Sequence, residues 1–330
     1  MKPALTIAIP TYQRIKYLKI SLSIILEQVR LQSPGLIEVI VSENCGDDGS
    51  WEYLKTLNYP GFLRINRNQK NIGSEGNFYV MQKMARGQYI WLLGDDDFLV
   101  DDAINCVLDG IRHEVDCLCL NFSIADHNMT IKKRSCIDFN EKNILTGIDE
   151  CVGNIPHMAF GFISAWISKT NLVFNIPEKD YRSFSFYGLS FMVDRYLMLS
   201  QRRSVFLISK VLLNSRKMSE AENLELNPNY NHFQQYIEGS GKVFEYLGAH
   251  GFNKRLLVRQ KNRFLLLFVM KRILYERGVG CFNFHDSNKI LYRYFPGFIY
   301  YFICLPIMMM PGLGLVIEQI YRRKLGLKNY

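Results

Sequence analysis

Three consecutive carboxylates, Asp95, Asp96 and Asp97, directly follow a short apolar run, and this junction restricts what the chain can fold into. Residues 89–93 are apolar or aromatic at every position, which is typical of a strand buried inside a parallel sheet. Adjacent like charges cost free energy unless a positive group lies among them. Because ligands of open α/β sheets collect beyond the carboxyl ends of strands, the pattern indicates a site for a divalent cation and a phosphate.

The same acids could instead belong to the start of a helix, since Asp is a favoured N-cap residue. A helix is expected to begin near Asp101, and Asp101 and Asp102 already supply its cap and an acidic first turn. The start of this helix therefore does not account for the acids at residues 95–97. The two alternatives for them are a metal site and a solvated acidic turn.

The amino-terminal half alternates apolar runs with amphipathic stretches, which predicts an α/β fold with a doubly wound, mostly parallel sheet. Strands are expected over residues 4–10, 36–42, 62–66, 89–93 and 115–122, and helices over about 15–30, 51–57 and 71–84. Gly87 is expected to close the third helix as a C-cap. Flavodoxin-like and receiver-like domains share this alternation. No glycine-rich phosphate loop follows the first strand, which excludes Rossmann dinucleotide and P-loop sites.

Four short motifs occur in order at the ends of these strands. They are Pro10-Thr11-Tyr12-Gln13, Ser42-Glu43-Asn44-Cys45-Gly46-Asp47-Asp48-Gly49-Ser50, Asn71-Ile72-Gly73 and Gly87-Gln88-Tyr89-Ile90. Over about residues 4–122, this set resembles the family 2 glycosyltransferases with the glycosyltransferase A fold. Gly94 stands before the acids where that family often has an aspartate. In this respect the chain resembles the subgroup of abequosyltransferases and other dideoxyhexosyl O-antigen transferases.

The resemblance implies that a nucleotide-sugar donor binds along the strand ends. The residues that it implies for the nucleotide are Pro10, Thr11, Tyr12, Arg14, Glu43, Asn44, Asn71, Gly73, Asp95 and Asp96. Asp97, together with Asp95, is implied to hold Mn²⁺ or Mg²⁺ against the diphosphate. A hard cation bound through oxygen would offset the negative charge that develops on the leaving group.

The transfer also needs a general base for the acceptor hydroxyl. The family places a carboxylate on a helix in the second half of the domain, and the best match is Asp194 in the apolar stretch 191–197. The alternative is a structural salt bridge, although adjacent Arg195 is a poor partner because neighbouring helix positions do not face each other. His157 and Arg216 are weaker candidates for contacts with the acceptor or diphosphate. Their alternatives are a buried core histidine and a solvated loop.

The carboxyl-terminal third is basic and partly apolar. Residues 201–330 carry 20 Lys and Arg against 8 Asp and Glu, a balance of +12, whereas residues 1–200 carry 20 against 23. Residues 254–277 form a basic stretch around an apolar centre, which suits a membrane surface. Residues 295–317 are almost entirely apolar but contain several Pro and Gly residues, which favours an in-plane or re-entrant anchor. The alternative is a helical hairpin buried against the rest of the chain.

These features predict three parts: a nucleotide-sugar-binding half over residues 1–122, an acceptor and base half over 123–228, and a helical, partly membrane-associated region over 229–330. The eight cysteines form no CxxC pair and no signal peptide is recognisable, so a reducing, cytoplasmic compartment is expected. Nothing resembles a nucleic-acid-binding module, so no nucleic-acid partner is expected.

The leading hypothesis is a metal-assisted glycosyltransferase of O-antigen or other surface polysaccharide synthesis, with a deoxy- or dideoxyhexose as one candidate sugar. Its acceptor would be a saccharide linked to a polyprenyl diphosphate. It would act as a peripheral or monotopic protein on the cytoplasmic face of the inner membrane, where a basic surface meets anionic lipid. The second hypothesis is a membrane-bound scaffold that keeps the fold without turnover.

Overall fold

Contacts divide the chain into two compact units, Met1–Asn229 and Tyr230–Tyr330, and each is considered by itself. The computed structural model describes residues 2–137, 143–173, 177, 179–180, 189–219, 222, 237–262, 266–278, 280, 282–295, 297–310, 312, 315–316 and 319–320. The predicted division into three parts is not tested by this partition and stays a prediction.

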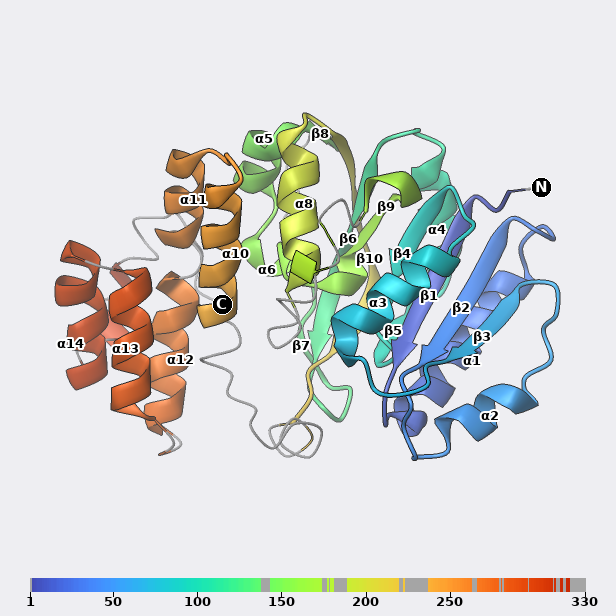
Figure 1. Ribbon diagram of the computed structural model, residues 1–330, viewed down its shortest axis with the longest axis horizontal. Coiled ribbons are helices and arrows are strands. Elements are labelled where there is room, and N and C mark those ends of the chain that lie inside the picture. The colour runs from blue at the N-terminus through green and yellow to red at the C-terminus, as the bar shows by residue number, and fades with distance from the viewer. Residues whose placement is uncertain are drawn as a thin grey trace. The chain divides into compact units, whose positions relative to one another are not determined.

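One mixed sheet runs through the first unit (Figure 1). In spatial order its strands are β3 (Leu63–Arg67), β2 (Ile37–Glu43), β1 (Leu5–Thr11), β4 (Tyr89–Leu92), β9 (Trp166–Lys169), β6 (Cys117–Ala125), β10 (Ser204–Arg216) and β5 (Asp97–Leu99). The short strands β7 (Ile131–Lys133) and β8 (Ile144–Thr146) pair with β6 and β10. The first four strands are parallel, as predicted, whereas β9 is antiparallel to both of its neighbours.

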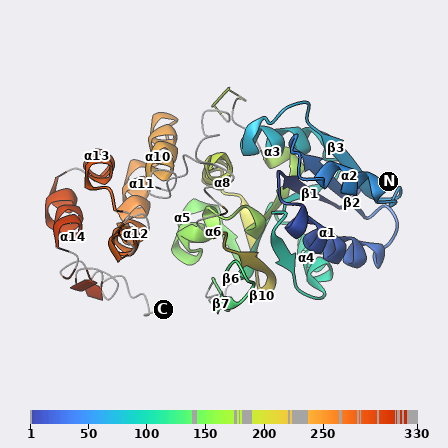
Figure 2. The ribbon, with the colours of Figure 1, turned by 90° about the horizontal axis from the view of Figure 1, so that it is seen from below.

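Helices cover both faces of this sheet. Figure 2 shows α3 (Gly73–Met84) and α8 (Ser190–Ser200) on one face, and α1 (Ile15–Arg30) and α4 (Ala103–Ile111) on the other. Further α-helices of this unit are α2 (Ser50–Thr56), α5 (Gly147–Asn154) and α6 (His157–Phe160). The apolar residues of α1 recur every three or four positions, so that one face of this helix is buried against the sheet.

Two local predictions were wrong. Helix α3 ends at Ala85 in extended conformation, and Gly87 is not its C-cap. Gly87 lies instead against β1, where its N–H donates to Oγ1 of Thr6 at 2.8 Å and where a Cβ atom would stand 2.5 Å from the Thr6 nitrogen. Asp102 occupies the N-cap position of α4 but makes no side-chain capping bond. Oε1 of Gln28 accepts from the Ile104 N–H in its place, at 3.1 Å.

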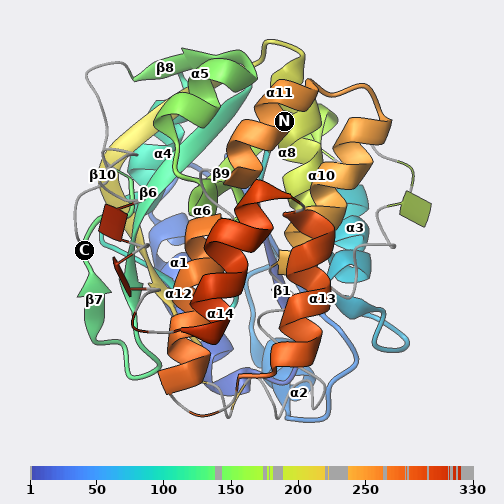
Figure 3. The same ribbon diagram turned by 90° about the vertical axis from the view of Figure 1, so that its left-hand side faces the viewer.

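The second unit is helical. It contains α10 (Gly239–Ala249), α11 (Lys254–Gln260), α12 (Leu266–Gly278), α13 (Phe284–Tyr294), the π-helical turn η5 (Tyr300–Cys304) and α14 (Leu305–Met309). The basic stretch expected over residues 254–277 thus forms two helices, α11 and α12. Figure 3 shows α12, α13 and α14 side by side. In the part of the chain that the structure describes, no helix is both long enough and apolar enough to span a membrane.

The apolar segment of this unit has two different faces. Tyr300, Cys304 and Ile307 are buried among the helices of this unit, and the predicted alternative, a hairpin that packs on the catalytic domain, stays a prediction. Phe298 and Phe302 stack on each other at 4.5 Å between ring centroids, yet they are 70% and 63% exposed. One face therefore packs on the protein, and the other leaves large apolar side chains uncovered.

Candidate functional site

The three acids lie in the turn between β4 and β5, at the carboxyl end of β4 as predicted. Asp95, Asp96 and Asp97 are only 3%, 8% and 4% exposed, so a solvated acidic turn is ruled out for them. Asp97 is the first residue of β5 and pairs with Ser215 of β10. The turn thus connects a central strand to the edge of the sheet, and the end of β10 is brought next to the acids.

Two arginines supply positive charge among these carboxylates. Nη1 of Arg14 donates to Oδ1 of Asp95 at 3.0 Å and lies 3.5 Å from Oδ1 of Asp96. Nη2 of Arg216 donates to Oδ2 of Asp96 at 3.0 Å. Arg14 follows the first strand motif and Arg216 ends β10, so both come from strand ends. The guanidinium groups of Arg14 and Arg216 therefore offset part of the negative charge of the acids, a role that the sequence predicted for a positive group.

Arg216 does not lie in a solvated loop, because its side chain is only 1% exposed. Its Nη1 contacts both carboxylate oxygens of Glu222, at 2.9 and 3.0 Å, and its guanidinium carbon lies 3.6 Å from the centre of the Tyr17 ring. The Tyr17 hydroxyl donates to Glu222 at 2.7 Å. Burial opposes ionisation of Glu222, but hydrogen bonds from Ser219, Tyr17 and Arg216 outweigh it and lower its pKa to about 2.

Asp97 is held differently from its neighbours. Its Oδ2 accepts a hydrogen bond from the Ser164 hydroxyl at 2.6 Å. Burial, with a further contribution from the charge of Asp96, raises the pKa of Asp97 to about 8. Burial also raises the pKa of Asp95 to about 6, against the opposing effect of Arg14. These two carboxyl groups therefore resist ionisation unless further positive charge enters the site.

The donor set fits a hard cation that is shared with a ligand. Oδ2 of Asp95 is buried and makes no hydrogen bond of standard geometry within the described residues, although the Thr11 hydroxyl lies close enough to lower the pKa of this carboxyl group. Nowhere in the described ranges do three His, Cys, Asp or Glu side chains group closely enough to hold a metal ion. Mg²⁺ is usually bound through one or two carboxylates, waters and substrate phosphates. Asp95 and Asp97 fit that role if a diphosphate completes the coordination.

An asparagine network forms the second part of the site, at the carboxyl ends of β2 and β3. Nδ2 of Asn44 donates to Oδ1 of Asn71 at 2.9 Å and to the Gly73 carbonyl at 3.2 Å. Nδ2 of Asn68 donates both to Asn44 and to Asn77, at 2.9 and 3.0 Å. The structure thus brings the predicted Asn44, Asn71 and Gly73 together. Asn68 and Asn77 were missed, although Asn68 stands directly after the third strand.

The ends of β1 and β2 are aligned, since Thr11 and Glu43 are paired in the register. Thr11 is buried and its hydroxyl faces the Asp95 carboxyl group, whose pKa it lowers, whereas Pro10 and Tyr12 are half-buried. Glu43 is fully buried. One of its oxygens accepts from the Gly46 N–H and the other lies 3.0 Å from Nε of Arg67. The predicted contact of Glu43 with a nucleotide base would therefore compete with these bonds.

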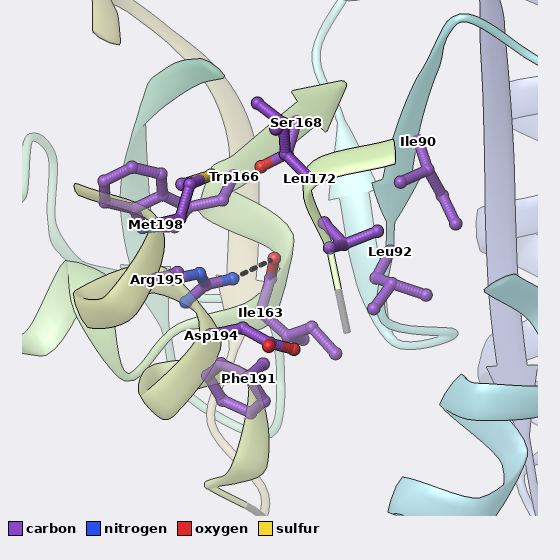
Figure 4. Close-up of a pocket in the computed structure, with 11 residues that line it drawn as sticks. Ile90, Leu92, Ile163, Trp166, Ser168, Leu172, Phe191, Asp194, Arg195 and Met198 are labelled. Carbon is purple, nitrogen blue, oxygen red and sulfur yellow. Dashed lines mark hydrogen bonds between the residues drawn. The ribbon is translucent and has the colours of Figure 1, made fainter. Parts of the chain in front are cut away.

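Asp194 lines a separate pocket of about 430 Å³, mouth included, between α8 and β4 (Figure 4). The lining is mainly apolar and consists of Ile90, Leu92, Ile163, Trp166, Ser168, Leu172, Val173, Phe191, Asp194, Arg195 and Met198. Arg195 donates to the carbonyls of Phe160, Phe162 and Ile163, the last at 3.1 Å. Asp95, Asp96 and Asp97 are not among the residues that line this pocket. His157 begins α6, and its side chain lies outside the described residues.

The comparisons with known proteins agree with this arrangement. Residues 6–166 match the model of the family described as glycosyl transferase family 2. This part of the chain is a family 2 glycosyltransferase domain, which confirms the resemblance found in the sequence. Its strand ends carry the acids, Arg14 and the asparagine network, whereas Arg216 lies beyond the matched residues.

Two curated relatives match part of the chain in sequence. The chain is 34% identical over 104 residues to abequosyltransferase RfbV of Salmonella typhimurium, covering 30% of each protein. It is 31% identical over 120 residues to chondroitin synthase of Escherichia coli, covering 36% of this chain and 17% of that enzyme. The chain thus spans less than a third of the length of the curated relatives that it matches.

Solved structures confirm a fold of the glycosyltransferase A type. The crystal structure of S. aureus TarS 1–349 in complex with UDP-GlcNAc has a TM-score of 0.59 at 14% identity, covering 99% of this chain and 93% of TarS 1–349. The same protein in complex with UDP has a TM-score of 0.51 at 16% identity, covering 87% and 86%. At this level of identity the likeness extends to the fold alone.

Proposed function

We propose that this protein transfers a sugar from a nucleotide-sugar donor to a lipid-linked oligosaccharide during O-antigen or other surface polysaccharide synthesis. The observation that carries this proposal is the meeting of Arg14 and Arg216 with three buried carboxylates at the end of β4. Such a mixed cluster suits a diphosphate, because guanidinium groups bind phosphate oxygens through paired hydrogen bonds. The family 2 domain and the TarS complexes with UDP and UDP-GlcNAc are consistent with it.

In this proposal, different strand ends bind different parts of the nucleotide-sugar donor. Asn44, Asn71 and Gly73, with the β1 end at Thr11, lie where the nucleoside would bind. Arg14 and Arg216 bind the diphosphate, and the chain of contacts through Glu222 and Tyr17 holds Arg216 in place. Mn²⁺ or Mg²⁺ held by Asp97 and Asp95 would supply further positive charge to the departing diphosphate.

Asp194 is the proposed general base for the acceptor hydroxyl. It is a carboxylate at the wall of an otherwise mainly apolar pocket, and a carboxylate is a suitable acceptor for the proton of an acceptor hydroxyl. The apolar lining also affects which class of sugar the pocket would accept. Leu92, Phe191 and Met198 offer no hydrogen-bond partners for hydroxyl groups, so the pocket suits a deoxy- or dideoxyhexose better than a fully hydroxylated hexose.

The second unit is proposed to bind the cytoplasmic face of the inner membrane, where a polyprenyl-diphosphate-linked acceptor would be found. The support is the uncovered apolar face formed by Phe298, Tyr301, Phe302, Met309 and Met310. Exposed apolar patches on an otherwise soluble fold mark interaction surfaces. The same unit is rich in Lys and Arg, which are attracted to anionic lipid headgroups.

The first test is a thermal-shift panel of the full chain with UDP-, CDP-, GDP- and dTDP-sugars, each with Mn²⁺, Mg²⁺ or EDTA. A donor at 100 times its Kd should stabilise the fold by about 2.7 kcal/mol. One nucleotide that raises the melting midpoint, and does so more with metal, is the expected result. If no nucleotide shifts the midpoint, the donor site assigned here does not exist.

The variant Asp194→Asn tests whether the protein is an enzyme or a scaffold without turnover. Asp194→Asn should still bind the donor but should lose transfer to an acceptor, since the amide cannot take up the proton. Transfer at the wild-type rate by this variant would mean that the base lies elsewhere. Donor binding without any turnover in the wild-type chain would favour the scaffold.

A further inference from the structure

Ser164 contacts the turn that carries the three acids and stands just before strand β9. It belongs to the short 3₁₀ turn η1 (Ile163–Ala165) that leads into β9, and it is fully buried. Its hydroxyl donates to Oδ2 of Asp97 at 2.6 Å and accepts from the Gly94 N–H at 2.9 Å. Its carbonyl accepts from the indole N–H of Trp91 at 2.8 Å. Both the backbone and the side chain of Ser164 are therefore fixed by β4 and the turn.

The direction of these hydrogen bonds follows when Asp97 is ionised, as it is when it binds a cation. A hydroxyl has one proton, and the Gly94 N–H can only donate, so the Ser164 proton then points to the Asp97 carboxylate. The other two acids are held by guanidinium groups, whereas no salt bridge to Asp97 is found among the described residues. The Asp97 carboxylate is thus oriented by uncharged donors and not by a cation: the Ser164 hydroxyl at 2.6 Å, together with the Ser215 side chain and the Arg216 backbone N–H.

Gly94 makes this arrangement possible. A Cβ atom at position 94 would stand 2.8 Å from Oδ2 of Asp97 and 3.4 Å from Oγ of Ser164. Any larger residue would push the carboxylate away from the hydroxyl. Gly94 therefore leaves room for the Asp97 carboxylate, and Ser164 donates a hydrogen bond to that carboxylate.

We infer that Ser164 is a positioning residue that orients the Asp97 carboxylate toward the donor diphosphate and its cation. This inference rests on the function proposed above. Groups that hydrogen-bond a metal-binding carboxylate fix its orientation, and their loss typically costs about 10–100-fold in metal affinity. Ser164 does not touch the donor in this assignment; it acts through Asp97.

The experiment compares Ser164→Ala with Ser164→Thr and with Ser123→Ala in the full chain. Ser123 is a matched control because it is buried and donates one side-chain hydrogen bond, to Asn214, without contacting an acid. The readout is the Kd for Mn²⁺, measured from the electron paramagnetic resonance signal of free Mn²⁺ with the nucleoside diphosphate that the wild type binds best. Thermal midpoints are recorded alongside.

We expect Ser164→Ala to weaken Mn²⁺ binding about tenfold or more, Ser164→Thr to stay within about threefold of the wild type, and Ser123→Ala to be unchanged. The midpoints of Ser164→Ala and Ser123→Ala should fall by similar amounts. If Ser164→Ala does not fold, Gly94→Ala tests the same contact from the opposite side and should weaken Mn²⁺ binding as well. Mn²⁺ affinity equal to the wild type in the folded variants would overturn the inference. A wild-type chain that binds neither Mn²⁺ nor a nucleoside diphosphate would refute the proposed function itself.

Discussion

Arg216 donates a hydrogen bond from Nη2 to Oδ2 of Asp96 across 3.0 Å, although the two residues stand 120 positions apart in the chain. The bond joins the last residue of β10 to the turn after β4. It also places a guanidinium group, already held by Glu222, against the acid cluster. In the proposed function, Arg216 would exchange a protein carboxylate for a phosphate oxygen when the donor binds.

Replacing Arg216 with Lys should weaken binding of a nucleoside diphosphate by about 10–100-fold, because a charge-assisted hydrogen bond contributes roughly 1.5–3 kcal/mol. Lysine keeps the charge but cannot span Asp96 and Glu222 together. Isothermal titration calorimetry measures the effect. Arg64→Lys is the control, since Arg64 pairs with Glu38 at 3.1 Å on another part of the sheet. Equal losses in the two variants would show that the effect is structural.

The raised pKa of Asp97 predicts that the metal-free protein loses stability as the pH rises. The unfolded chain releases this proton near pH 3.8, whereas the folded chain keeps it until about pH 8. The stabilising contribution is therefore complete below about pH 4 and is lost as the pH rises through 8. Urea unfolding midpoints in EDTA should fall between pH 5 and pH 8, and the fall should be smaller in Asp97→Asn.

Glu75 provides a comparison for that measurement. It is buried in α3, and burial raises its pKa to about 7, so Glu75→Gln should also reduce the fall over the same pH range. Asp95, with a pKa near 6, adds to the remaining slope. An unchanged slope in Asp97→Asn would mean that this carboxyl group is ionised in the folded protein at neutral pH.

Gly87→Ala should destabilise the fold by about 1–3 kcal/mol, the usual cost of overpacking. The new methyl group would overlap the Thr6 backbone, which belongs to a buried strand and cannot move aside cheaply. Chemical denaturation gives the free energy of unfolding. Gly153→Ala is the matched control, because nothing lies within 4 Å of its added carbon and α5 is helical there. That variant should be neutral or slightly more stable.

The double variant Phe298→Ser and Phe302→Ser should reduce sedimentation with vesicles that contain anionic lipid, without lowering the thermal midpoint. Both rings are mostly exposed, so their removal costs little packing. Leu31→Ser removes an exposed apolar side chain of the first unit and should leave vesicle binding unchanged. Equal binding by the double variant and the wild type would exclude this face as the lipid contact.

The amino-terminal half was predictable because its signals are local. The α1 boundaries coincide with the expected 15–30, and β1, β2, β3 and β4 lie within one residue of the expected runs, as buried parallel strands and amphipathic helices require. The strands β5, β9 and β10 were not predicted. Asp97 and its neighbours look like a turn in sequence, and only the partner strand β10 gives them an extended conformation.

Part of the site follows from the motifs, and part of it depends on contacts that no motif records. The asparagines and acids stand directly after apolar runs, so they could be identified as strand-end groups. Ser164 precedes a strand that was not anticipated, and nothing in its immediate sequence marks it. Arg216 was only a weaker candidate for contact with the diphosphate, in an expected loop, because its burial depends on packing against Tyr17 and Glu222.

The long spacing between the acids and their partners has a consequence for how the protein is made. Synthesis proceeds from the amino terminus, so Asp95, Asp96 and Asp97 emerge well before Ser164 and Arg216. During that interval, Arg14 is the only one of these partners that has left the ribosome, and the carboxylates remain hydrated because burial would cost too much. The acidic turn therefore closes only after β9 and β10 have joined the sheet, late in the folding of this unit. A nascent chain released before residue 216 would hold the asparagine network, Arg14 and the three acids without the guanidinium group of Arg216.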